Sequence, residues 1–147
     1  MAWTKLQISQ HLQAVKLLEK IQENTLKFLK QNPCATEFTL GKFIKLQFKQ
    51  NNLISEKQSC IIGFNANTAN PHYFATNKKS LKLKNNSLIL IDVWARLKQP
   101  NSPFADLTWM FFKGKKIPLE IQKNFALLVK SREKGFEFIK QKLTQGK

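Results

Sequence analysis

The stretch "SLILIDVWARLKQPNSPFADLTW", residues 87–109, holds the pattern that decides the fold. It starts with a continuous apolar run, Leu88–Val93, which predicts a buried strand. The segment "KQPNSP" (98–103) contains two prolines and predicts the connection of a hairpin. "FADLTWMFFKG" (104–114) is then the returning strand, closed by Gly114. We therefore expect an antiparallel β-hairpin over these residues.

Asp92 and Asp106, the only aspartates of the chain, both lie in apolar sequence inside this hairpin. Buried carboxylates cost several kcal/mol unless they are hydrogen-bonded, paired or metal-bound. The hairpin would bring the two positions roughly opposite each other. Either one carboxyl is then protonated or a cation lies between them, and Mn, Co, Fe, Zn and Mg accept such oxygen ligands. Alternatively, each aspartate caps a turn or accepts backbone N–H groups at a strand end.

The flanking segments predict three helices and one more strand. The expected elements are a helix over residues 9–30, a helix capped by Thr36 and ending near Gln50, a strand over residues 60–64 and a helix that Pro118 opens. "NNLIS" (51–55) is expected to be a turn and short connection. We expect one α+β domain over residues 1–147, in the order α-α-β-β-β-α, with helices packed on a mainly antiparallel sheet.

The last helix shows an apolar stripe at helical spacing. The residues expected on its buried face are Ile121, Phe125, Leu128, Phe136, Ile139 and Leu143.

Charge and composition limit the classes of binding partner that we expect. The net charge is +16, but of 25 basic residues only Arg96 and Arg132 are arginines, and the lysines are spread along the chain. Lysine- and asparagine-rich usage is typical of an AT-rich genome, and arginine is the side chain best suited to phosphate and guanine contacts. We expect no specific nucleic-acid partner, and a nonspecific nucleic-acid binder remains a third hypothesis. Two cysteines and no long apolar run favour a cytoplasmic protein without membrane contact.

Three segments in order resemble one family. "NANTANPHY" (65–73), "SLILIDVWARL" (87–97) and "FADLTW" (104–109) are similar to motifs of the pita-bread metallopeptidases, which include methionine aminopeptidase, aminopeptidase P and prolidase. The aminopeptidase P and prolidase branch is the most similar. The resemblance implies a partial pita-bread fold, a peptide substrate and a divalent metal such as Mn, Co, Zn or Fe. It implies that Asp92 binds one metal, that Asp106 bridges two, and that His72 contacts the substrate.

The family completes its dinuclear site with a histidine and two glutamates from a later half of the domain. No histidine follows His72, and Glu120, Glu133 and Glu137 lie in the expected last helix. We therefore expect residues 1–147 to be a truncated N-terminal half of a catalytic domain, with weak or absent metal binding and no activity alone. A second-half chain, or self-association, would then be its partner. The alternative is a non-catalytic pita-bread module that binds peptides or proteins.

Overall fold

The computed structural model describes residues 2–145, which form two compact units divided between Lys113 and Gly114. The first unit contains α1 (Lys5–Gln31), α2 (Glu37–Gln50), β1 (Leu53–Ile54), β2 (Cys60–Phe64), the 3₁₀ helix η1 (Asn65–Ala69), β3 (Ser87–Leu97) and β4 (Ala105–Lys113). The second contains α3 (Leu119–Thr144). The α+β class and the order of the expected elements are confirmed, with β1 and η1 in addition. No helix among residues 2–145 combines the length and the apolar character that a membrane crossing requires.

Local capping decides where the first two helices begin. α1 starts at Lys5 rather than at the expected Ser9, because Thr4 and Gln7 exchange hydrogen bonds in a capping box. α2 starts directly after its expected cap, Thr36, whose hydroxyl accepts from the backbone N–H of Thr39.

β3 is the central strand of the sheet and pairs antiparallel with β1, β2 and β4. β2 and β4 both pair with residues 89–93, so they lie on opposite edges of β3. The expected hairpin and the strand at residues 60–64 are confirmed. The segment "NNLIS", expected to be only a connection, contributes β1, because Leu53 and Ile54 pair with Leu97 and Arg96.

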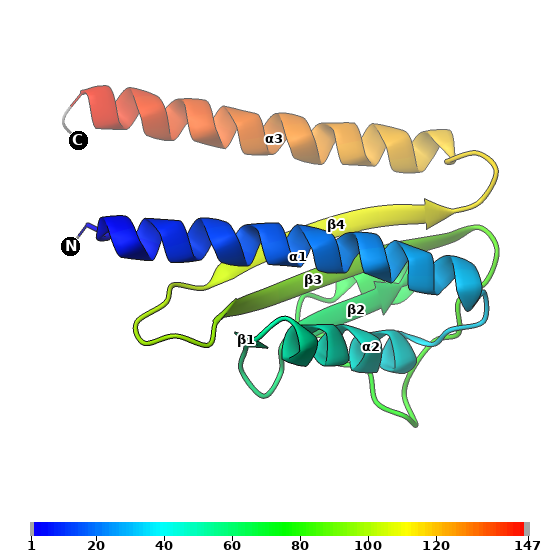
Figure 1. Cartoon of the computed structure of the whole chain (residues 1–147). Helices are drawn as coiled ribbons and strands as arrows, with labels where there is room; N and C mark the ends of the chain where they lie inside the picture. The colour runs from blue at the N-terminus through cyan, green and yellow to red at the C-terminus, as the bar shows by residue number, and fades with distance from the viewer. Residues whose placement is uncertain (1, 146–147) are drawn as a thin grey trace. The chain divides into compact units, whose positions relative to one another are not determined.

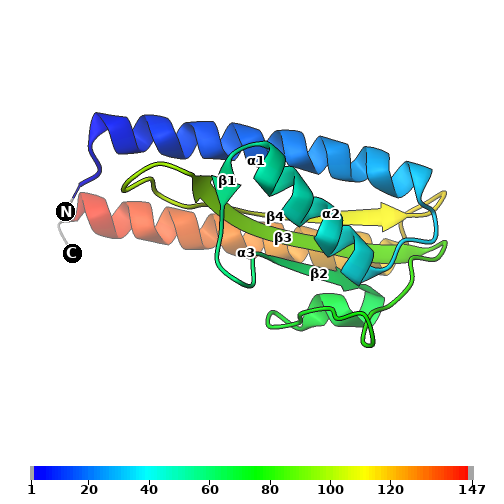
Figure 2. The ribbon, with the colours of Figure 1, turned by 60° about the horizontal axis from the view of Figure 1, so that its bottom comes forward.

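The core lies on one face of the sheet, where α1 and α2 pack. Residues of β3 alternate between buried and half-buried positions, and Ile89, Ile91 and Val93 point into the core. Leu18 of α1 and Ile44 of α2 are fully buried against them. Figures 1 and 2 show α1 running along β3 and β4 while α2 lies beside β2. The predicted buried strand is confirmed, with alternate side chains fully buried under the helices and the others half-buried on the opposite face.

α3 contradicts the expected buried face of the last helix. None of its residues is buried, Ile121 is half-buried, and Leu128 and Leu143 are 68% and 71% exposed. Phe125, Phe136 and Ile139 are also at least half exposed. The physical reason is that α3 is the one regular element of its compact unit, so no neighbouring element of that unit covers its apolar stripe.

Candidate metal centre

Asp92 and Asp106 project from adjacent strands on the same face of the sheet. In the β3–β4 register, Asp92 lies opposite Thr108 and Asp106 lies opposite Trp94. Directly opposed residues of antiparallel strands share a face, and so do residues two apart on one strand. The aspartates are therefore diagonal neighbours, two residues out of the opposed register that the hairpin connection suggested. This face is the one opposite the α1–α2 core.

The two carboxyl groups interact with each other. The pKa of Asp106 is raised from its ordinary value of 3.8, first by partial burial and then by the negative charge of Asp92 and a hydrogen bond to it. The Thr108 hydroxyl donates to Oδ1 of Asp92 over 2.7 Å and so holds that carboxylate in place. The arrangement favours either a proton on Asp106 or a cation near both groups.

The expectation that both aspartates are buried is wrong. Asp92 is half-buried and Asp106 is exposed. The physical reason is again strand alternation, which directs both side chains away from the core. Partial exposure lowers the cost of charging the pair, and it leaves their oxygens open to a ligand. The hydrogen bond that Asp92 receives comes from a side-chain hydroxyl, not from a backbone N–H at a strand end.

Among the hydrogen bonds of residues 2–145, none joins His72 to this pair. It is exposed in the loop after η1, and its backbone N–H donates to Oδ1 of Asn70 over 2.9 Å. Within residues 2–145, no cluster of three or more histidine, cysteine, aspartate or glutamate side chains is arranged to hold a metal ion. The structure therefore joins Asp92 to Asp106 and does not add His72 to them.

Glu37 is a buried polar residue whose role the sequence pattern does not indicate. Its side chain is fully buried, although its position suits an ordinary first-turn acid of α2. The carboxylate accepts from the backbone N–H of Phe64 at 2.6 Å and of Leu81 at 2.7 Å. It also accepts from Nδ2 of Asn67 at 2.9 Å and from the Tyr73 hydroxyl at 2.7 Å.

This network explains part of the "NANTANPHY" motif. Asn67 and Tyr73 belong to that motif, so it serves to hold the loop that carries His72. Burial and the hydrogen bond to Glu37 raise the pKa of Tyr73 to about 12. A glutamate directly after a capping threonine is common, so Glu37 by itself gives no signal. Its contact with Asn67 and Tyr73 could have been predicted only by noticing that the motif "NANTANPHY" needs a buried acceptor and that Glu37 lies upstream of it.

The chemistry of the aspartate pair fits a hard divalent cation. Carboxylate oxygens are preferred ligands of such ions, and Asp106 already responds to the negative charge of Asp92. Two side chains supply only part of a coordination shell, so their own affinity for a metal is expected to be weak.

Comparisons with known proteins show which family and which fold the chain shares. The family model "Metallopeptidase family M24" matches residues 9–147. An X-Pro aminopeptidase from Thermotoga maritima MSB8 has a similar structure, with a TM-score of 0.77 and 17% identity over 90% of this chain and 35% of that one. An X-prolyl aminopeptidase from Caenorhabditis elegans, described as a cytosolic enzyme with a di-nuclear active site, matches with a TM-score of 0.62 and 21% identity.

The second match covers 78% of this chain and 18% of the nematode enzyme, so the chain spans a minor part of both solved structures. No curated protein sequence matches significantly. At these low identities, the structural similarity establishes a shared fold only. This is the aminopeptidase pita-bread fold, which the motifs predicted. The family match extends over most of the sequence. The chain therefore belongs to metallopeptidase family M24.

Proposed function

We propose that this chain is the part of a peptidase catalytic domain that contributes Asp92 and Asp106 as ligands of a divalent metal. The observation that carries the proposal is the diagonal carboxylate pair on the open face of the β3–β4 hairpin. Its substrates would be peptides, and the X-Pro aminopeptidases of similar fold favour a peptide with proline in second position.

In this proposal, Asp92 and Asp106 would hold the metal, which would be Mn, Co, Zn or Fe. A bound metal would supply a polarised water that is nucleophilic at neutral pH. Thr108 orients Asp92 through its 2.7 Å hydrogen bond, so this ligand keeps one position. His72 would contact the substrate, on a loop whose neighbouring Tyr73 is tied to Glu37.

We further propose that the remaining ligands come from outside residues 1–147. The absence of a larger metal-binding cluster within residues 2–145 supports this, since a dinuclear site needs more donors than two aspartates. Residues 1–147 would then bind metal weakly and be inactive without a second half.

Calorimetric titration of the purified chain with Mn²⁺ or Co²⁺ tests the ligand assignment. We expect weak, saturable binding that the double substitution Asp92→Ala/Asp106→Ala abolishes. A matched variant, Glu133→Ala/Glu137→Ala, also removes two acids, both exposed on α3, and is expected to bind as the wild type does. Equal loss in both variants would assign the binding to general charge. Unchanged binding in the aspartate variant would overturn the site.

A further inference from the structure

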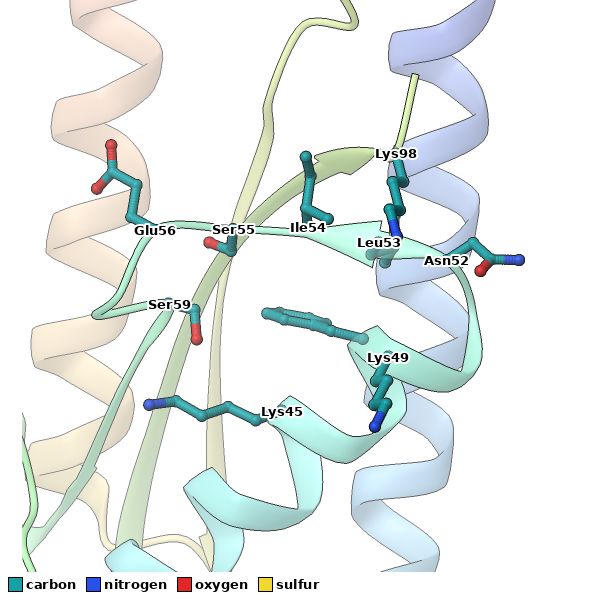
Figure 3. A pocket seen from close by; sticks show the side chains of 10 residues that line it. Lys45, Lys49, Asn52, Leu53, Ile54, Ser55, Glu56, Ser59 and Lys98 are labelled. Atoms are coloured by element: carbon teal, nitrogen blue, oxygen red, sulfur yellow. The ribbon is translucent and has the colours of Figure 1, made fainter. Parts of the chain in front are cut away.

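A cavity at the end of α2 is lined by positive charge. It has a volume of about 430 Å³ and lies between the end of α2, β1 and the segment leading into β2. Lys45 and Lys49 reach it from α2, and Lys98 reaches it from the end of β3. Figure 3 shows the Lys45 side chain extending below Ser59, the ammonium group of Lys98 beside Leu53, that of Lys49 directed away from β1, and the carboxylate of Glu56 turned away. The lining therefore carries three cationic groups against one acid.

These lysines have no ionic partner in the structure. Among residues 2–145 the ion pair found within 4.0 Å is Arg132 with Glu133, in α3. Lys45 and Lys49 are four residues apart on one helix, a spacing at which like charges repel. Three unpaired cations that line one cavity make its electrostatic potential positive, and this potential favours binding of an anion.

The end of α2 does not oppose an anion in the way an open helix terminus would. Helix C-termini carry exposed carbonyls and partial negative charge. Here the backbone N–H of Asn51 donates to the carbonyls of Gln47 and Phe48 over 3.1 and 3.2 Å. The side-chain amide of Asn51 donates to the Gln47 carbonyl as well, over 2.8 Å. The carbonyls of Gln47 and Phe48 therefore already accept hydrogen bonds.

Buried polar groups complete the lining. Ser59 is 4% exposed, and Figure 3 shows its hydroxyl directed toward the part of the cavity that Lys45 approaches. Burial raises the pKa of the neighbouring Cys60 thiol to about 11, while the charge of Lys45 and a hydrogen bond with the Ser59 side chain lower it and the charge of Asp92 raises it further. Ser55 also lines the cavity, but its hydroxyl donates to the Trp94 carbonyl.

We propose that this cavity binds the phosphate group of a small molecule, with Lys45, Lys49 and Lys98 as the cationic contacts and the Ser59 hydroxyl as a further donor. Its volume lies within the range of small-molecule sites, about 300–1,000 Å³. Lysine binds phosphate as a point charge. A phosphate dianion offers oxygens to several ammonium groups at once, whereas a carboxylate has two oxygens and a single charge. The lining does not include Asp92, Asp106 or His72, so this proposal does not rest on the peptidase function.

NMR titration of the ¹⁵N-labelled chain with inorganic phosphate, against chloride at equal ionic strength, tests the proposal. We expect saturable shifts concentrated in residues 45–59 and at Lys98, with one phosphate bound per chain. The double substitution Lys45→Ala/Lys98→Ala should weaken phosphate binding about tenfold, as expected for the loss of charge-assisted hydrogen bonds. Neither side chain is buried, so the variant should retain the wild-type spectrum elsewhere.

A matched control separates this site from the general attraction of a chain with net charge +16. Lys16→Ala/Lys20→Ala removes two exposed lysines from α1 and lowers the net charge by the same amount. It should leave phosphate affinity unchanged. Equal weakening in both variants, or shifts spread over lysines throughout the chain without saturation, would overturn the proposal. If an additional Ser59→Ala variant binds phosphate as tightly as the wild type does, the Ser59 hydroxyl is not a phosphate donor.

Discussion

At the scale of single residues, Glu37 joins three segments of the first unit. Its carboxylate accepts from the end of β2 through Phe64, from η1 through Asn67, and from the loop after η1 through Tyr73 and Leu81. The group is fully buried, and of these donors the Tyr73 hydroxyl also reaches the Lys79 carbonyl over 3.3 Å. A single side chain thereby determines the path of residues 64–81.

We expect Glu37→Ala to lower the free energy of unfolding by about 3–5 kcal/mol, because it leaves several buried donors without an acceptor. Tyr73→Phe removes one donor and should cost about 1–3 kcal/mol. Urea unfolding followed by circular dichroism measures both. Glu19→Ala, at an exposed position of α1, is the control and should change stability by less than about 0.5 kcal/mol. Equal effects of Glu37→Ala and Glu19→Ala would contradict the role of the network.

Asp106 predicts a pH dependence of stability in metal-free protein. Folding raises its pKa above 3.8, so the folded state holds that proton more tightly than the unfolded state. The ionised group then disfavours folding, and its contribution to stability falls as pH rises from the ordinary pKa through the raised one. Below the ordinary pKa this effect vanishes.

Asp106→Asn should therefore raise Tm at neutral pH and leave it unchanged at a pH well below 3.8. Thermal unfolding of both proteins across this range, in the presence of a chelator, makes the comparison. A Tm difference that does not vary with pH would refute the assignment. Saturating Mn²⁺ should reverse the order at neutral pH, because the wild type would gain a ligand that binds the folded state.

At the scale of elements, close backbone approach decides how η1 follows β2. A Cβ at Gly63 would lie 2.8 Å from the Asn67 carbonyl oxygen and 2.9 Å from the Thr68 nitrogen. Both are backbone atoms, so the 3₁₀ helix would have to move to make room. Glycine at this position allows η1 to fold back on its own strand.

Gly63→Ala should destabilise the chain by about 1–3 kcal/mol through overpacking. Gly41→Ala is the matched control, because its Cβ would have an ordinary 3.7 Å contact with Sγ of Cys60. Gly41 lies inside α2, so alanine there should stabilise the chain by about 0.5–1 kcal/mol. Chemical unfolding gives both values, and a loss of stability at Gly41 equal to that at Gly63 would contradict the steric argument.

Contacts with α1 also hold the hairpin connection, residues 98–104, in place. Nδ1 of His11 on α1 lies 3.0 Å from the Phe104 carbonyl oxygen, and the Gln10 side chain donates to that of Gln99. His11 would be read from the sequence as a plain surface residue. Its contact depends on the docking of residues 98–104 against α1, which pairs positions about ninety residues apart and which no local pattern encodes.

At the scale of the whole molecule, no other regular element of its own unit covers the apolar side chains of α3, and an uncovered apolar face favours association. Its large exposed side chains are Leu119, Phe125, Leu127, Leu128, Phe136, Phe138, Ile139 and Leu143. We expect the purified chain to self-associate at micromolar concentration unless a partner is present. Sedimentation velocity over a concentration series measures this directly.

The triple substitution Leu128→Gln/Phe136→Gln/Ile139→Gln should shift the chain toward monomer mass. Leu6→Gln/Leu12→Gln changes exposed apolar residues of α1 and should leave the association as it is. A wild-type chain that stays monomeric at the highest concentration would refute the expectation. Equal shifts in both variants would place the association elsewhere on the molecule.

The sequence by itself determined the elements that depend on local patterns. Thr36 and Pro118 predicted where helices begin, and "KQPNSP" predicted the hairpin connection, because capping, proline geometry and turn chemistry act over a few residues. The predicted hairpin put Asp92 and Asp106 on adjacent strands, as the structure has them. Only the tertiary structure decided which side chains of those elements are buried and which are exposed. It directed both aspartates away from the core, buried Glu37, and left α3 exposed, because burial depends on which segments pack together over long sequence distances.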